Sequence, residues 1–397
     1  MTAALAAFTA CAGREAADGA PVEAIGTVRE IYDGTLTPDA ARRTFRNTER
    51  LFATRVVPAG PSPRQLPLHA QAQRDVYVPV GADSLPLDSV LVLNRVTGFL
   101  VLRDGQVLLE RYRGGNTAET RWMSMSVAKS VLGVLVGAAL HDGHLRSLDT
   151  AITALVPSLR GSAWEDVTLR HAIAMRSGLA WTEAYADSSS DRRRLLEAQL
   201  AQQPGAMDAV LRSLHRDVPP GTRTVYSTGE TQVVAMALRA AVGMPLAEYL
   251  SARVWGPAGM ARDAEWWLDA PGGVEIGGSG LVATLRDYGR FGQFVLERGI
   301  VGRDTILPPW YVDSLGRKSG QVFGADYSYG WLWWPLTKEL PASHRAFTAE
   351  GIHGQFILVD PLARVVIVQW AARPEAQGGE QISDYDVFAA VIRAAMR

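Results

Sequence analysis

The segment RWMSMSVAKSVLGVLVGAAL, residues 121–140, places Ser126 three positions before Lys129 and then continues to Leu140 without another charged residue. A lysine at the start of so apolar a segment is costly if it is buried, because a low-dielectric environment disfavours the ammonium form. Two interpretations are open. The lysine stem can lie along the surface with its ammonium in water. Alternatively, Ser126 is a nucleophile and Lys129 helps to remove its proton.

The spacing of Ser126 and Lys129 suits a helix, since side chains at i and i+3 lie on one face. Gly143 after the apolar run is a typical stop signal, so the segment predicts a helix that Ser126 opens. Free N–H groups and the dipole at a helix N-terminus favour an attacking alkoxide and the oxyanion that follows. A lysine one turn deeper would be desolvated and could act as a base near neutral pH. Ser-x-x-Lys alone, however, often arises by chance.

A second segment, PPGTRTVYSTGETQVVAMAL (219–238), places Tyr226 between a turn-forming Pro-Pro-Gly and the start of a helix. A tyrosine in this position can point into a cleft and move a proton between a leaving group and a lysine. The alternative is a half-buried aromatic residue without a chemical role, which is the usual situation of tyrosine.

A third segment, EGIHGQFILVDP (350–361), contains a turn followed by a strand. Gly354 allows the backbone to approach a ligand closely. The N–H of Gln355 would then complete an oxyanion hole with the N–H of Ser126. His353 is expected to be structural, because a lone histidine beside a strand is more often hydrogen-bonded in the core than catalytic.

Together the three segments resemble the serine β-lactamase and penicillin-binding-protein superfamily, in its class C-like branch. Other similar segments occur in the order that this family uses: DVTLRHAIAMRSGL, GGSGLVATLRDYGRFGQ and YSYGWLWW. Within the branch, MSVAKS, YSTGETQ and GIHGQFILVDP are most similar to 6-aminohexanoate-dimer hydrolases, which cleave short nylon oligomers, and to related esterases. The resemblance implies Ser126 as nucleophile, Lys129 as base and Tyr226 as proton relay. It also suggests Tyr185, in WTEAYAD, as a substrate-contacting residue.

Two departures from the family pattern bear on the substrate. Enzymes that act on β-lactams or peptidoglycan usually carry Lys-Thr-Gly where this chain has Ile352, His353 and Gly354. The resemblance implies that these three residues are substrate-binding positions. The missing lysine would have held a substrate carboxylate. Those enzymes also commonly carry asparagine two places after the tyrosine, where Thr228 offers no amide. Both departures argue against efficient β-lactam hydrolysis, and β-lactamase or DD-peptidase activity stays as an alternative.

A nylon oligomer carries a terminal ammonium group, which an acidic residue of the enzyme should receive. Glu183, Asp187 and Asp191 are the candidates, and the sequence does not choose among them.

The composition is that of a folded globular chain, with 397 residues, 47% apolar and 20% charged residues, and a formal net charge of −1. The lack of a long basic run argues against a nucleic-acid partner, and no apolar stretch reaches transmembrane length. The single cysteine, Cys11, excludes an intrachain disulfide. The segment LAAFTACAG is similar to the end of a bacterial lipoprotein signal, although no Lys or Arg precedes Cys11. We therefore expect an exported protein, periplasmic or lipid-anchored at Cys11, or a cytoplasmic one if this segment is not a signal.

The order of the elements predicts an α/β fold of the α+β type, similar to β-lactamases and DD-peptidases. Two apolar runs around Asp104-Gly105 predict a hairpin over residues 98–112. Later in the chain, strands are expected at YGWLWWPL, FILVDP and RVVIVQWAA. Helical patterns occupy the middle of the sequence. An antiparallel sheet from both ends of the chain, flanked by helices, and a helical second domain follow. The expected regions are a signal-like segment and tether (1–24), an extended surface arm (25–80), a discontinuous sheet domain (81–125 and 271–397) and a helical domain (126–270).

Other functional classes fit the sequence less well. A Ser-His-Asp hydrolase would show G-x-S-x-G, which no serine of this chain satisfies. HDGH at 141–144 lacks the HExxH pattern of a metal site. A non-catalytic binding or sensor module would be expected to lose Ser126, Lys129 or Tyr226. The sequence therefore predicts a serine hydrolase that cleaves a small ester or amide through an acyl-enzyme on Ser126, without a metal or organic cofactor.

Overall fold

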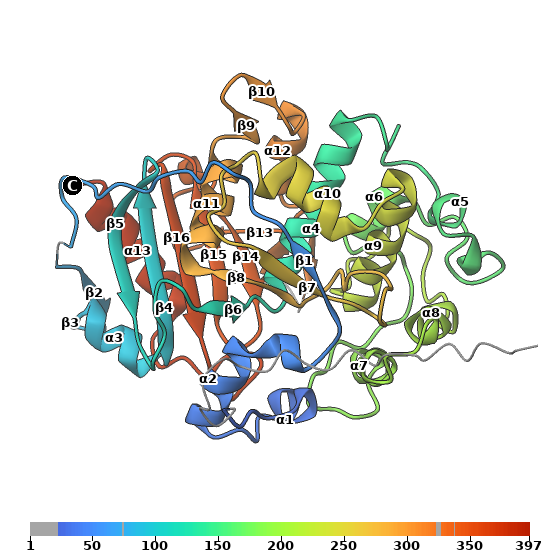
Figure 1. The fold of residues 1–397 in the computed structure, drawn as a ribbon, viewed down its shortest axis with the longest axis horizontal. Coiled ribbons are helices and arrows are strands. Elements are labelled where there is room, and N and C mark those ends of the chain that lie inside the picture. The colour runs from blue at the N-terminus through green and yellow to red at the C-terminus, as the bar shows by residue number, and fades with distance from the viewer. Residues whose placement is uncertain (1–22, 74, 323–326, 337) are drawn as a thin grey trace, which may run out of the picture.

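The computed structural model describes residues 23–397, apart from residues 74, 323–326 and 337. At its centre lies a six-stranded antiparallel sheet with the strand order β13-β14-β15-β16-β4-β5 (Figure 1). Its strands are β4 (Val96–Arg103), β5 (Gln106–Tyr112), β13 (Trp334–Pro335), β14 (Phe347–Gly351), β15 (Gln355–Asp360) and β16 (Val365–Ala371). The early and late parts of the chain therefore meet in one sheet, as predicted.

The predicted hairpin joins β4 to β5. Asp104 and Gly105 both have positive φ, which a two-residue turn between twisted strands requires. The other edge of β4 pairs with β16, with Val365 opposite Arg103. This single long-range pairing connects the two halves of the sheet.

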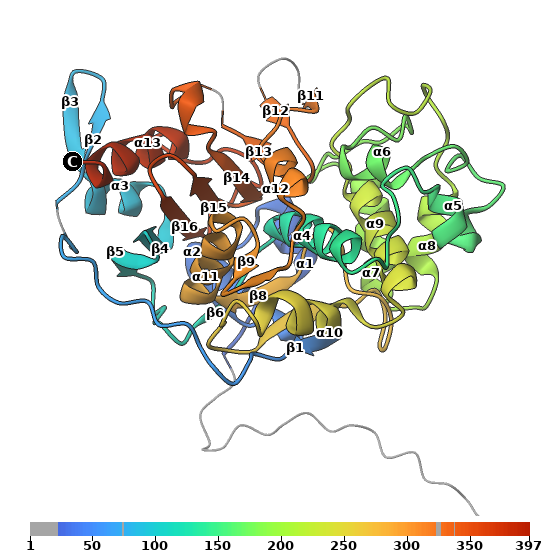
Figure 2. The same cartoon turned by 90° about the horizontal axis from the view of Figure 1, so that it is seen from above.

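Each face of the six-stranded sheet is covered by helices (Figure 2). One face carries Leu100 and Val366, which lie against α11 (Leu285–Leu296), and Gly289 and Gly292 of this helix leave room for them. The alternate side chains of the strands belong to a separate apolar cluster on the opposite face. The helices of that cluster are α3 (Leu87–Leu93) and α13 (Asp384–Ala395).

The part of the chain from residue 127 to residue 255 is mainly helical and lies on the right in Figure 1. Its helices are α4 (Val127–His141), α5 (Ile152–Leu155), η2 (Pro157–Leu159), α6 (Leu169–Ile173), α7 (Asp191–Leu200), α8 (Ala206–Arg212), α9 (Thr228–Val242), α10 (Leu246–Leu250) and η3 (Ser251–Trp255). The helix predicted from Ser126 onward is α4, which Gly143 follows with a φ of 78°.

A second, four-stranded sheet of order β1-β7-β8-β6 leads the chain to Ser126. Its strands are β1 (Thr54–Val57), β6 (Arg121–Met123), β7 (Ala264–Trp267) and β8 (Leu281–Thr284). The N–H of Ser124 donates to the carbonyl of Leu281 over 2.9 Å. The pairing of β6 with β8 thus fixes the segment that enters α4.

The remaining elements are short. They are η1 (Thr48–Arg50), β2 (Tyr77–Val80), β3 (Asp83–Pro86), β9 (Ile300–Val301), β10 (Asp304–Thr305), α12 (Pro309–Leu315), β11 (Gly320–Val322), β12 (Tyr327–Tyr329) and η4 (Ala342–His344).

The segment 25–80 is only in part the extended arm that the sequence predicts. Its first part contains two helices, α1 (Val28–Asp33) and α2 (Pro38–Arg46), each begun by a threonine whose side chain caps the first turn. Phe45 of α2 is fully buried, with its ring centroid 5.4 Å from that of Trp122. The helical part therefore packs into the core, whereas residues 58–67 contain no helix or strand.

YGWLWWPL is not one continuous strand. β12 ends at Tyr329 and β13 begins at Trp334, and between them Leu332 adopts a positive φ. The N–H of Gly330 donates to the carbonyl of Trp333 over 2.8 Å, which closes a turn inside the predicted strand.

Cys11 and the predicted signal-like segment lie outside the described residues. Within the residues that the structure describes, no single helix is both long and apolar enough to cross a membrane. The helices at 228–242 and 246–255, which meet at a bend of 74°, would together be long and apolar enough by length and composition alone.

The contact between α4 and α12 predicts that two glycines of α4 tolerate replacement by alanine to different degrees. A methyl group on Gly137 would lie 2.6 Å from the ring of Tyr311, which is anchored by a hydrogen bond from its hydroxyl to the carbonyl of Gly133. We expect Gly137→Ala to lower the free energy of unfolding by about 1–3 kcal/mol through overpacking, as measured by urea denaturation.

Gly133→Ala is the matched control, because its nearest atom would be 3.2 Å away. It should cost clearly less than Gly137→Ala, because its methyl group meets no atom as close as the Tyr311 ring; the gain of about 1 kcal/mol in helix propensity applies equally to both changes. Equal losses at the two positions would contradict the packing described for Tyr311.

Candidate active site

Ser126 lies at the junction of β6 and α4. Met125 has a positive φ of 48°, a sparsely populated conformation that turns the chain sharply from the strand into the helix. Ser126 occupies the N-cap position and is 8% exposed. Its side chain is therefore at the helix N-terminus, where the helix dipole favours negative charge.

Lys129 is buried one turn further along α4, with 1% of its surface exposed. Its Nζ lies 2.8 Å from Ser126 Oγ and 2.9 Å from the carbonyl oxygen of Gly278. Burial lowers the pKa of Lys129 to about 7, and the negative charge of Glu183 partly opposes this effect. The interpretation in which the ammonium reaches water is wrong, and a neutral amine is available near neutral pH.

Tyr226 lies just before α9, with its ring centroid 5.1 Å from Lys129 Nζ. Its hydroxyl is hydrogen-bonded to Ser126, and burial, followed by the charge of Glu183, raises its pKa above the ordinary value. The ring packs on Trp334 at 5.2 Å between centroids. Ser126 Oγ thus contacts an amine that can accept a proton and a phenol that can donate one.

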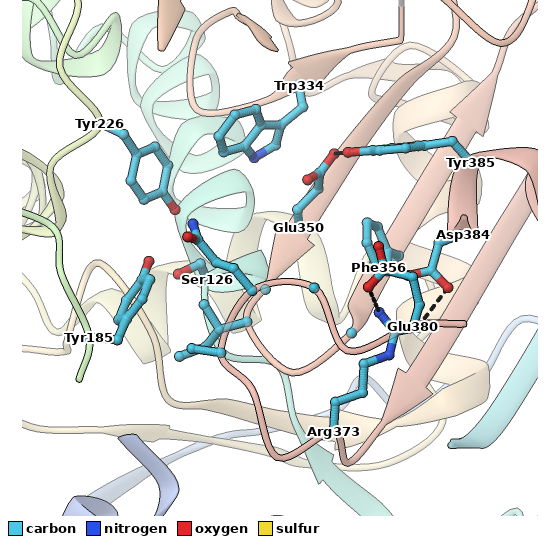
Figure 3. Close-up of a pocket in the computed structure, with 16 residues that line it drawn as sticks. Ser126, Tyr185, Tyr226, Trp334, Glu350, Phe356, Arg373, Glu380, Asp384 and Tyr385 are labelled. Atoms are coloured by element: carbon cyan, nitrogen blue, oxygen red, sulfur yellow. Dashed lines mark hydrogen bonds and ion pairs between the residues drawn. The ribbon is translucent and has the colours of Figure 1, made fainter. Parts of the chain in front are cut away.

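Ser126 opens into a pocket of about 270 Å³ between the helical part and the six-stranded sheet (Figure 3). One side is aromatic, with Tyr185, Tyr226 and Trp334 around the nucleophile. The opposite side is polar. Its ionisable side chains are Glu350, Arg373, Glu380, Asp384 and Tyr385.

The polar side was missed from the sequence, because its members belong to no motif. Arg373 is buried and donates to Glu380 over 3.2 Å and to Asp384 over 2.7 Å, so its charge is balanced within the wall. Glu350 accepts from the hydroxyl of Tyr385 over 2.8 Å. Burial raises the pKa of Glu350 to about 7. The only sequence signal was its position directly before the Gly-Ile-His-Gly turn.

The turn between β14 and β15 brings the substrate-binding residues of the third segment to the pocket. Ile352 and Gly354 line it, whereas His353 does not. His353 has a φ of 66°, and its Nδ1 lies 2.8 Å from the carbonyl oxygen of Arg373. Burial lowers the pKa of His353 to about 4. The geometry therefore fits the structural role expected from the sequence.

Gln355, whose N–H the sequence predicts as part of an oxyanion hole, is not among the residues that line the pocket. Its side chain accepts from the indole N–H of Trp122 over 2.9 Å and donates to the carbonyl of Ala371 over 2.7 Å, inside the sheet and outside the pocket. The N–H groups of Ser126 and Ile352 have no acceptor among the described residues. A Cβ on Gly351 would lie 3.0 Å from Ser126 N. The backbone at Gly351 therefore lies close to Ser126, and the oxyanion-hole role of the Gln355 N–H stays a prediction.

Of the loop residues considered for substrate contact, only Tyr185 lines the pocket. Asp187 accepts from the side chain of Ser189, and Asp191 accepts from the N–H and hydroxyl of Thr182. Glu183 is buried behind Tyr226 and contacts Thr228. None of these three acids lines this pocket.

Within the part of the chain that the structure describes, no group of three or more His, Cys, Asp or Glu side chains has the arrangement of a metal site.

The chain belongs to the beta-lactamase family, whose model matches residues 95–391. It is 28% identical over 333 residues to the 6-aminohexanoate-dimer hydrolase of Paenarthrobacter ureafaciens, which covers 78% of this chain and 83% of that protein. A solved Bacillus anthracis protein of the 6-aminohexanoate-dimer hydrolase type aligns with a TM-score of 0.77 and 23% identity, over 90% of this chain and 94% of the other. A family VIII carboxylesterase aligns with a TM-score of 0.59 and 14% identity, over 78% and 96%.

The predicted family and fold are therefore confirmed. The chain has the mixed α/β fold with antiparallel sheets that β-lactamases and penicillin-binding proteins share. It is a serine hydrolase of the amidase or esterase type.

The contact of Lys129 with Ser126 predicts how the reactivity of the serine depends on pH. The rate constant for labelling Ser126 with a fluorophosphonate should be low at pH 5 and rise through about pH 7, because only the neutral amine can accept the serine proton. The labelling rate is measured between pH 5 and 9.

Lys129→Met has a side chain of similar length without a proton acceptor, and it should lose about 10²–10⁴-fold in labelling rate. A wild-type rate that is constant across this pH range would contradict the assignment of Lys129 as the base.

Proposed function

We propose that the protein hydrolyses a small amide or ester through an acyl-enzyme on Ser126. The observation that carries this proposal is the buried 2.8 Å contact between Lys129 Nζ and Ser126 Oγ. Neutral Lys129 accepts the serine proton while Oγ attacks the substrate carbonyl carbon, which forms a tetrahedral intermediate. The N–H groups of Ser126 and Ile352 stabilise its oxyanion.

Tyr226 then donates its proton to the leaving amine or alcohol, and the protonated Lys129 replaces that proton. The carbon–leaving-group bond breaks, and the acyl group stays on Ser126. Water attacks this ester after the same pair removes its proton, and the acid is released with Ser126 restored. The hydrogen bond between Tyr226 and Ser126 supports this proton path.

We further propose that the substrate is an oligomer of the 6-aminohexanoate type or a similar amide with a terminal ammonium. The relative from Paenarthrobacter ureafaciens bears this activity in its name. The polar side of the pocket offers Glu350, a buried carboxyl whose raised pKa a bound ammonium would lower, so that the carboxylate forms together with its cationic partner. The aromatic side offers Tyr185 and Trp334 to the aliphatic chain.

β-Lactamase or DD-peptidase activity has less support from the pocket. Ile352 stands where a lysine would bind the substrate carboxylate, and Arg373 is already paired with Glu380 and Asp384. The hydroxyl of Thr228 donates to Glu183 and so turns away from the substrate.

The proposed function is tested with purified wild type and Ser126→Ala, each with p-nitrophenyl butyrate, 6-aminohexanoate dimer and a chromogenic cephalosporin. We expect hydrolysis of the dimer and the ester by the wild type, weak or no cephalosporin turnover, and loss of at least about 10³-fold in Ser126→Ala. Equal rates in the two proteins would refute the serine mechanism, and preferred cephalosporin turnover would refute the substrate class.

Glu350→Gln separates recognition of the ammonium from chemistry. Since a charged hydrogen-bond partner is lost, KM for 6-aminohexanoate dimer should rise about tenfold. kcat/KM for the neutral butyrate ester should change by less than about twofold. Glu248→Gln is the control, because Glu248 is an exposed glutamate of α10 that lines neither this pocket nor the neighbouring cavity that contains Glu350. Equal losses with both substrates would show that Glu350 does not recognise a cation.

A further inference from the structure

Glu183 is buried next to the catalytic residues but does not face the substrate pocket. Its side chain is 3% exposed. It accepts hydrogen bonds from the indole N–H of Trp181 and from both the backbone N–H and the hydroxyl of Thr228. These donors hold the Glu183 carboxylate firmly against Thr228, which is the first residue of α9 and lies two positions after Tyr226.

Arg192 of α7 balances this carboxylate from the other side. Its side chain is 4% exposed, and its Nε lies 3.8 Å from Glu183 Oε1. The guanidinium donates to the hydroxyl of Tyr32 and lies 4.8 Å from the centroid of the Tyr32 ring. The buried guanidinium of Arg192 therefore lies between the Glu183 carboxylate and the Tyr32 ring, and through Tyr32 it contacts the N-terminal helix α1.

Tyr32 belongs to α1, outside the residues 95–391 that the family model matches. Figures 1 and 2 place α1 beside α7. The Tyr32 ring also lies 5.8 Å from that of Tyr185, which lines the pocket. The N-terminal segment thus contacts both Arg192 and a wall of the pocket.

Thr228 connects this charge pair to Lys129. A Cβ on Gly278 would lie 2.6 Å from Thr228 Cγ2 and 3.3 Å from Lys129 Nζ, so both groups pack on the same backbone atom. The ionisable side chains that act on Lys129 are Tyr226 before α9, Glu183 in the loop after α6, and Arg192 on α7.

We propose that the buried pair of Glu183 and Arg192 positions the general base of this site and sets the charge around it. Tyr32 of α1 holds Arg192 in place. Glu183 and Arg192 are positioning residues, because they act through Lys129 and Thr228 and do not touch the substrate. The proposal rests on the role of Lys129 given under the proposed function.

The two members of the pair act on Lys129 in opposite directions. The negative charge of Glu183 stabilises the ammonium form and raises the pKa of Lys129, whereas Arg192 lowers it. Removal of the carboxylate should therefore shift deprotonation of Lys129 to lower pH. Removal of the guanidinium should shift it to higher pH. A general loss of packing would admit water and also raise the pKa of Lys129, so the shift to lower pH in the carboxylate variant is the change that loss of packing cannot produce.

The experiment is a direct titration of Lys129 by NMR. The chain has only three lysines, Lys129, Lys318 and Lys338, so protein labelled with ¹³C,¹⁵N-lysine gives few signals. The signal of Lys129 is the one that disappears in Lys129→Met. We expect Glu183→Gln to lower the pH of half-titration by about one unit and Arg192→Gln to raise it by a similar amount.

Glu230→Gln is the matched control. Glu230 is also a buried glutamate, but it lies in α9 and accepts a hydrogen bond from the hydroxyl of Ser177. Burial raises its pKa to about 8, so Glu230→Gln removes little charge at neutral pH. It should leave the Lys129 titration unchanged. Tyr32→Phe removes only the hydrogen bond to Arg192 and should shift the titration in the same direction as Arg192→Gln, by less.

Shifts of the same sign in Glu183→Gln and Arg192→Gln, or no shift in either, would overturn the proposal. So would a shift in Glu230→Gln as large as in Glu183→Gln. An unchanged titration in Tyr32→Phe would refute the role of α1. The titration needs no substrate, so it can fail while Ser126→Ala abolishes hydrolysis, or succeed while the proposed activity is absent, and the two failures are distinguishable.

Discussion

The desolvation of Lys129 is the constraint on which the site depends. The Lys129 side chain is enclosed by an apolar helix, the carbonyl of Gly278 and the Tyr226 ring. Bulk water would stabilise the ammonium, and the amine would then be a poor base at neutral pH. The apolar sequence of α4 is therefore chemically necessary as well as structurally favourable. The same burial makes every nearby charge count, since screening by water is weak there.

The fold supplies the two halves of the site from distant parts of the chain. Ser126 and Lys129 come from the junction of β6 and α4, and the Gly351-Ile352 backbone comes from the end of β14. The two halves approach closely here, since a Cβ on Gly351 would lie 2.5 Å from the carbonyl oxygen of Ser124 and 3.0 Å from Ser126 N. A larger residue at position 351 would push the two halves apart, so the close approach of the two backbones requires a glycine there. The pairing of β4 with β16 fixes the sheet that presents β14 to α4.

The sequence predicts those features that depend on local patterns. The hairpin at Asp104-Gly105 and the placement of Ser126 and Lys129 on one helix follow from spacing alone. The acidic wall at Glu350 and the position of Glu183 could not be predicted, because both result from long-range packing. Which backbone N–H of the turn between β14 and β15 points toward Ser126 likewise depends on the geometry of that turn and not on a sequence pattern. The helices α1 and α2 were missed although each begins with a capping threonine.

The division of the pocket into two sides explains how one family serves different substrates. The side that does chemistry is built on α4 and α9, and it depends on buried contacts that allow little variation. The opposite side is built on β14, β16 and the start of α13, and its charges are set by residues such as Glu350, Arg373 and Asp384. Because Arg373 is neutralised within this wall, an anionic substrate gains no free cation from it. The proposed recognition of a cationic end group uses the net negative charge that remains, and it is separate from the proposed reaction at Ser126.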